Sequence, residues 1–138
     1  MDKRISYLQL IQGVITRMAS NSFKLKGWAV TLVAGIFVLA EKEADRVFFL
    51  VAYIPVIAFW FLDSYYLLQE RLYRALYDKA RRIKEEEIDY SLKADADEFG
   101  RDKNTLVSCL FSRTELVFYA PLAIVCAGII IVSIFVWD

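Results

Sequence analysis

The sequence contains no histidine, which removes the commonest general base, the commonest metal ligand and the usual partner of a nucleophilic serine or cysteine. It has only two cysteines, Cys109 and Cys126, whose spacing matches no metal-binding pattern, so we expect reduced thiols. Glycine-rich phosphate loops, nucleophile elbows and metalloprotease motifs are also missing. The sequence therefore predicts a protein that is not an enzyme and that carries no metal and no cofactor.

The chain also has no formal net charge, because 17 basic residues balance 17 acidic ones. Any site for an anion must therefore be local. What the chain has in excess is apolar residues: 58% are hydrophobic, and the mean hydropathy is +0.40. Because these residues fall in blocks, the composition indicates an all-α membrane protein. Without an internal repeat, we expect one membrane domain over residues 1–138.

Three apolar blocks predict transmembrane helices at residues 25–40, 47–66 and 116–137. The third is the clearest, because it crosses a bilayer's length without a charge. The first is short, so lysines at its start would have to snorkel towards the interface. The second contains Pro55, which removes a backbone donor and is expected to kink the helix.

An amphipathic helix is predicted before the first span, over residues 3–20. Its apolar residues recur at helical spacing. We expect it to lie at the membrane interface or to pack on the bundle, and the alternative is that it plugs or gates a pore. The run Ser20, Asn21 and Ser22 is expected to break the chain into two helices. The apolar residues are Ile5, Leu8, Ile11, Val14, Ile15 and Met18.

The second span is expected to continue into water as a cytoplasmic helix over residues 67–87. A single rod from Arg46 to about Glu87 would be roughly 60 Å long at 1.5 Å per residue. Its apolar stripe needs a partner, either the N-terminal helix or another copy of the chain. A loop with a short helix is predicted for residues 88–115. The stripe comprises Leu68, Leu72, Leu76, Ala80 and Ile83.

Basic residues are distributed unevenly around the spans. Five lie before or at the start of the first span, two lie between the first and second, ten lie between the second and third, and none follows the third. The positive-inside rule therefore predicts that the N-terminus and residues 67–115 are cytoplasmic and that the C-terminus is outside.

The cytoplasmic helix carries basic and aromatic side chains on one face. Such a stripe can hold phosphates and stack a base, which predicts a site for an anionic nucleotide. The i,i+4 ion pairs Glu70–Arg74 and Asp78–Arg82, or contacts with anionic lipid heads, account for the same charges without a ligand. The candidate ligand-binding residues are Arg74, Tyr77, Arg81 and Lys84, flanked by Arg71 and Arg82.

Two features lie within the predicted spans. Gly27, Thr31 and Gly35 form a stripe of small residues at four-residue spacing, which favours close helix packing or, alternatively, a pore-lining face. Asp63 stands where the second span leaves the membrane. We expect it to pair with a lysine of the first span, Lys24 or Lys26, and the alternative is a place on an ion pathway.

The segments RMASNSFKLKGWAVTLVAGIFVLA and DSYYLLQERLYRALYD resemble blocks shared by small bacterial membrane proteins. The layout of an amphipathic helix, a transmembrane hairpin and a long cytoplasmic extension is similar to SLATT-type effectors of anti-phage systems, and in size and plan to the membrane effector of the Hailong system. The third span is an addition to the plain SLATT pattern.

The resemblance implies a homo-oligomeric ion channel or pore-forming effector of the bacterial inner membrane, with a tetramer as the working stoichiometry. It also implies control by a nucleotide or single-stranded oligonucleotide and a partner nucleotidyltransferase encoded nearby. The alternative is a membrane anchor or adaptor that conducts no ions and docks a soluble cytoplasmic partner.

Overall fold

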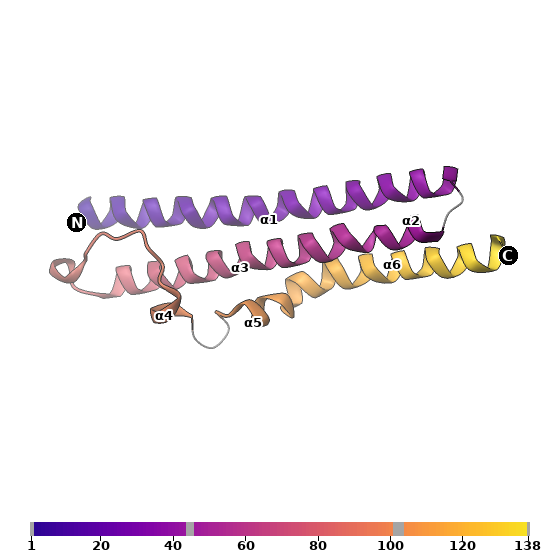
Figure 1. Cartoon of the computed structure of the whole chain (residues 1–138). Helices are drawn as coiled ribbons and strands as arrows, with labels where there is room; N and C mark the ends of the chain where they lie inside the picture. Colours follow the sequence, from indigo (N-terminus) through magenta and orange to yellow (C-terminus); the bar gives the residue numbers. More distant parts are fainter. Residues whose placement is uncertain (1, 44–45, 101–103, 138) are drawn as a thin grey trace. The chain divides into compact units, whose positions relative to one another are not determined.

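The computed structural model describes residues 2–43, 46–100 and 104–137 (Figure 1). All the regular elements within these ranges are helical, which confirms the predicted all-α class. Three stretches are long and apolar enough to cross a membrane: Lys3–Leu39, Phe49–Arg82 and Arg113–Val136. The elements are α1 (Asp2–Glu43), α2 (Arg46–Val51), α3 (Tyr53–Arg82), the 3-10 turn η1 (Glu85–Glu87), α4 (Ala96–Phe99), α5 (Leu106–Leu110) and α6 (Arg113–Trp137).

Helix α1 is continuous and unites the two segments predicted at residues 3–20 and 25–40. The expected break at Ser20–Ser22 is therefore wrong. Serine and asparagine favour caps, but inside a helix each costs at most about 0.7 kcal/mol relative to alanine. Because α1 contains no proline, nothing in this region removes a backbone donor, and the helix propagates through the polar run.

The second apolar block is interrupted at Ala52, between α2 and α3. Pro55 has no N–H group, so the carbonyl of Val51 lacks its usual helical donor four residues on. The Ala52 N–H donates instead to the Phe49 carbonyl, three residues back, at 3.3 Å. Pro55 therefore disrupts the helix as predicted, but the expectation of one unbroken rod from Arg46 is wrong.

Helix α3 also ends earlier than predicted, at Arg82 instead of Glu87. A longer helix would place Glu85–Glu87 in its last turn, where the negative end of the helix dipole repels carboxylates. The chain instead becomes extended at Lys84, with ψ of 143°, and turns through η1. The last turn of α3 keeps Lys79, Arg81 and Arg82, whose charges suit that end of a helix.

The loop predicted for residues 88–115 holds two short helices, α4 and α5, and α6 begins at Arg113. Asp95 caps α4 by accepting a 2.9 Å hydrogen bond from the Asp97 N–H. Pro121 lies inside α6, which continues through it. Residues 44–45, between the first and second predicted spans, and residues 101–103, in the predicted loop, lie outside the described residues.

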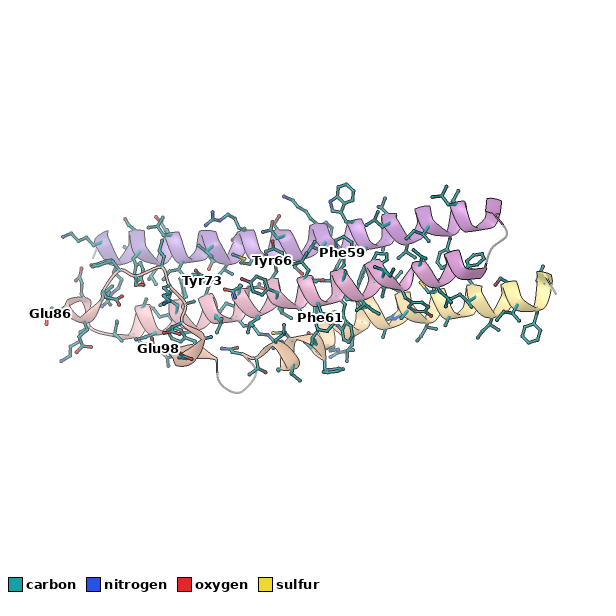
Figure 2. The ribbon with its side chains drawn as sticks, in the orientation of Figure 1. Phe59, Phe61, Tyr66, Tyr73, Glu86 and Glu98 are labelled. Atoms are coloured by element: carbon teal, nitrogen blue, oxygen red, sulfur yellow. The ribbon has the colours of Figure 1, made fainter. Side chains whose placement is uncertain are left out.

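The chain divides into two compact units, each built from distant stretches of sequence. Unit 1 comprises Met1–Ser22 and Ser64–Cys109, and unit 2 comprises Phe23–Asp63 and Leu110–Asp138. In unit 1 the predicted apolar stripe of α3 packs on the N-terminal part of α1, which is one of its two expected partners. Tyr73, labelled in Figure 2, packs at the edge of this core. The core residues are Tyr7, Ile11, Ile15, Leu76, Ala80 and Ile88.

Unit 2 is built from the second part of α1, α2, the first part of α3, and α6, with α2 and α6 side by side (Figure 1). Its outer surface is apolar: Trp28 is 61% exposed, Ile124 is 70% exposed and Phe135 is 81% exposed. So large an apolar surface on one unit is typical of a protein surrounded by lipid or by other protein. Its core comprises Ala29, Val33, Ala52, Val56, Tyr119 and Cys126.

Candidate functional site

A buried ionic cluster lies inside unit 2. The Lys26 ammonium is 2.5 Å from Asp63 Oδ2 and 3.5 Å from Glu115 Oε1. Both carboxylate side chains are fully buried, and the lysine side chain is 16% exposed. Tyr119 donates its hydroxyl to Asp63 Oδ2 at 2.9 Å. Asp63 therefore pairs with Lys26, one of the two lysines predicted for it.

Two further hydrogen bonds within unit 2 join side chains of α3 to backbone carbonyls of α5 and α6. The Trp60 indole N–H donates to the Leu110 carbonyl at 2.9 Å. The Tyr53 hydroxyl donates to the Ala123 carbonyl at 3.3 Å. One bond therefore joins α3 to the last residue of α5, and the other joins α3 to α6.

Aromatic rings complete the environment of the lysine. Its ammonium lies 5.9 Å from the centre of the Phe118 ring and 6.0 Å from that of Tyr119, within the range of cation–π attraction. The second oxygen of Glu115, Oε2, is buried and makes no hydrogen bond within the part of the chain that is described. The cluster thus combines one ammonium and two buried carboxyl groups, one of which has an oxygen without a hydrogen-bond partner among the described residues.

Sequence reasoning missed Glu115 and Tyr119, because Glu115 stands just before the uncharged block and looks like its cytoplasmic flank. A signal was nevertheless available. The buried residues of α6 are Glu115, Tyr119, Cys126 and Ser133, at spacings of four, seven and seven. That is the periodicity of a helix face that packs against other helices. The polar residues of an otherwise apolar helix mark its inner face.

The small-residue stripe lies on the outside of unit 2. Gly27, Thr31 and Gly35 are all exposed, and a Cβ atom added at either glycine would meet nothing within 4 Å. The Thr31 hydroxyl donates to the Gly27 carbonyl in the same helix, at 2.9 Å. The stripe is therefore not used to pack the helices of unit 2 on one another, and it does not meet Asp63 through any described contact.

Part of the predicted cationic stripe lines a cavity of about 320 Å³ in unit 1. The cavity brings Arg74, Tyr77 and Arg81 of α3 together with Gln12 of α1, which the sequence reasoning had not singled out. Arg71, Arg82 and Lys84 are not among its lining residues. Lys84 lies beyond the end of α3, so helical spacing does not place it on the same face as Arg74 and Arg81. The lining is completed by Ile15 and Asp78.

The arginines of this cavity already have carboxylate partners. Arg74 pairs with Glu70 at 3.0 Å, as predicted. Asp78 was expected to pair with Arg82, but its carboxylate pairs with Arg81 at 3.2 Å, and the Arg82 Nε–H donates to the Asp78 carbonyl. Basic side chains near a helix C-terminus commonly bond backbone carbonyls in this way, which explains the difference.

These pairs leave binding capacity at the cavity. A guanidinium carries five N–H donors, and the Arg81 pair uses Nε, so the terminal amino groups are positioned for another acceptor. Both arginine side chains are more than half exposed, which makes them accessible to a solute. Two guanidinium groups and a tyrosine ring around one cavity suit a ligand with a phosphate and an aromatic base. Asp78 within the lining disfavours a polyanion that lies against it.

No protein-family model, no curated protein and no solved structure matches the chain. Within residues 2–43, 46–100 and 104–137, no group of three histidine, cysteine or acidic side chains is arranged to hold a metal ion. The ionic cluster of unit 2 and the cavity of unit 1 are the two candidate sites.

Proposed function

We propose that the chain is a subunit of a homo-oligomeric ion channel or pore-forming effector of the bacterial inner membrane. An anionic nucleotide or oligonucleotide, bound at the Arg74–Tyr77–Arg81 cavity, controls it. The observation that carries this proposal is the division of chemistry between the units. Unit 2 exposes large apolar side chains, whereas unit 1 carries an open cavity with two arginines and a tyrosine. That combination suits a membrane segment joined to a sensor of a water-soluble anion.

The orientation follows from the distribution of basic residues, which favours unit 1 on the cytoplasmic side and the C-terminus outside. A cytoplasmic cavity has access to intracellular nucleotides. The resemblance to anti-phage effectors suggests the biological setting, in which a nucleotidyltransferase encoded nearby makes the ligand. Channel opening then dissipates ion gradients and stops growth of the infected cell.

In this proposal several copies of the chain together form the conducting path. The exposed Gly27–Thr31–Gly35 stripe is the surface of unit 2 best suited to another copy, since small residues let helices approach closely. In such an assembly the ligand shifts a closed–open equilibrium only by binding one state more tightly than the other. A tetramer remains the working stoichiometry.

Replacing Gly35 with leucine is expected to weaken the oligomer without unfolding the subunit. A Cβ atom added at Gly35 meets nothing within 4 Å, so the subunit itself has space for the start of the new side chain. Gly128→Leu is the matched control, because a Cβ atom there also meets nothing within 4 Å. Native mass spectrometry from detergent micelles should show smaller assemblies for Gly35→Leu alone. A wild-type oligomer for Gly35→Leu would remove the stripe from the interface.

Ion flux from liposomes that contain the purified protein tests the function itself. Potassium-loaded vesicles are expected to leak when, and only when, the appropriate nucleotide or short DNA or RNA oligomer changes the state of the channel. Protein-free vesicles with the same ligands provide the baseline. Vesicles that hold their gradient with every ligand, and without ligand, would reject a channel and leave the adaptor function.

The adaptor alternative is favoured by a second surface of unit 1. An open apolar groove of about 490 Å³ lies where α1 meets the loop after η1. Leu10 is 58% exposed there, and Tyr90 and Leu92 are each 42% exposed. Tyr90 also holds a left-handed backbone, with φ of 58°, and packs edge-on against Tyr7. An apolar patch of this kind is typical of a surface that docks another protein.

A further inference from the structure

We propose that the Lys26–Asp63–Glu115 cluster is a proton-binding site, in which the two buried carboxyl groups share one proton that resides on Glu115. The ligand of this site is the hydrogen ion, and its binding depends on neither nucleotide nor conduction. It therefore goes beyond the proposed channel function and can be tested apart from it.

The charges of one ammonium and two carboxylates in the cluster do not balance without a proton. One ammonium lies within bonding distance of both carboxyl groups and compensates one negative charge. Both carboxyl side chains are fully buried, and an uncompensated buried charge is strongly unfavourable. A bound proton removes the second charge. Two carboxyl groups in one site commonly resolve their repulsion in this way.

The two carboxyl groups differ in the hydrogen bonds that they accept. Asp63 Oδ2 accepts hydrogen bonds from both the Lys26 ammonium, at 2.5 Å, and the Tyr119 hydroxyl, at 2.9 Å. Glu115 receives the more distant contact from the lysine, and its Oε2 is buried without a hydrogen-bond partner within the described part of the chain. A neutral carboxyl group tolerates that situation far better than an anionic oxygen does. The geometry assigns the proton to Glu115 Oε2.

One effect opposes this assignment. Glu115 lies in the first turn of α6, where the helix dipole favours a negative charge. The dipole effect is smaller than the cost of an uncompensated buried carboxylate, so it does not reverse the balance. The titratable side chains that meet at the site come from three helices: Lys26 from α1, Asp63 from α3, and Glu115 and Tyr119 from α6.

The sign of the resulting pH dependence follows from proton counting. Unit 2 with Glu115 protonated binds one more proton than a hydrated state, in which water reaches the cluster and both carboxyl groups ionise. Acid therefore favours the protonated unit, and alkaline pH favours the hydrated state. Any rearrangement that lets water between α1, α3 and α6 releases a proton.

Infrared spectroscopy of the full chain in lipid nanodiscs tests the site. The wild type at pH 7 should show the carbonyl band of a protonated carboxyl group, and this band should disappear at alkaline pH. Either Glu115→Gln or Asp63→Asn should abolish the band at pH 7, because the remaining carboxylate is then balanced by Lys26. Glu98→Gln is the control, since that side chain is half exposed and pairs with Lys79.

The wild-type titration needs no substitution, so it decides the matter even where a variant fails to fold. Absence of a protonated carboxyl band in the wild type at pH 7 would overturn the proposal. Persistence of the band in both folded variants would overturn it as well, because the proton would then belong to another residue. A band that is lost in both variants and kept in Glu98→Gln would establish the shared proton.

Discussion

Replacing Lys26 with methionine should destabilise unit 2 by about 3–5 kcal/mol at neutral pH, which is the typical cost of removing one partner of a buried ion pair. Methionine keeps most of the length of the side chain but removes the charge that lies between Asp63 and Glu115. One buried carboxylate is then left without a compensating cation unless it also takes up a proton. The loss of stability should therefore be smaller at acid pH and larger at alkaline pH.

Unfolding of the purified protein in detergent micelles, followed by circular dichroism across a range of pH, measures this loss. Lys24→Met is the matched control, because it removes the same charge from an exposed position two residues away. That variant should change stability by no more than about 0.5 kcal/mol. The neutral triple variant Lys26→Met, Asp63→Asn, Glu115→Gln should recover part of the loss. Equal stability of the two lysine variants would show that the cluster contributes nothing to the fold.

Charge reversal at Arg74, Arg81 and Lys84 should abolish the response to nucleotide and leave membrane insertion intact. Each hydrogen bond to a charged group contributes about 1.5–3 kcal/mol, so losing two guanidinium groups should weaken binding at least about 100-fold. The lining of the cavity narrows this prediction to two of the three residues. Arg74 and Arg81 line it and Lys84 does not, so the double variant Arg74→Glu, Arg81→Glu should account for nearly all of the effect.

Calorimetric titration of the reconstituted protein with the nucleotide or oligomer that triggers flux measures the binding. Lys93→Glu is the matched control, since it carries the same charge change but lines a different cavity of unit 1. It should bind the ligand as the wild type does. Full affinity in the Arg74→Glu, Arg81→Glu variant would reject the cavity as the site, and an equal loss in Lys93→Glu would point to a general electrostatic effect.

Much of the helical layout was predictable because it rests on hydrophobic periodicity and length. The uncharged block at residues 116–137 became α6, and the stripe containing Leu76 and Ala80 became the buried face of α3. The pairing of Asp63 with a lysine of the first span was also predictable, since a buried carboxylate needs a cation. These features depend on strong local signals or on unavoidable charge compensation.

What was missed depends on local competition or on distant contacts. The polar run at Ser20–Ser22 carries capping chemistry, but continuation of the helix was more favourable there. The unbroken rod expected from Arg46 is instead divided at Ala52, between α2 and α3. Glu115 joins the cluster only because α6 packs against α3 in one register, and sequence spacing alone does not specify that register.

The central claim is that a ligand in the unit 1 cavity controls ion flow across the membrane, and one measurement addresses it most directly. Ion flux is recorded from liposomes that contain either the wild type or the Arg74→Glu, Arg81→Glu variant, at equal protein density, before and after addition of nucleotide or short oligomer. We expect the ligand to change flux through the wild type and to leave flux through the variant unchanged. An equal response of both proteins, or no flux from either under any condition, would contradict the account.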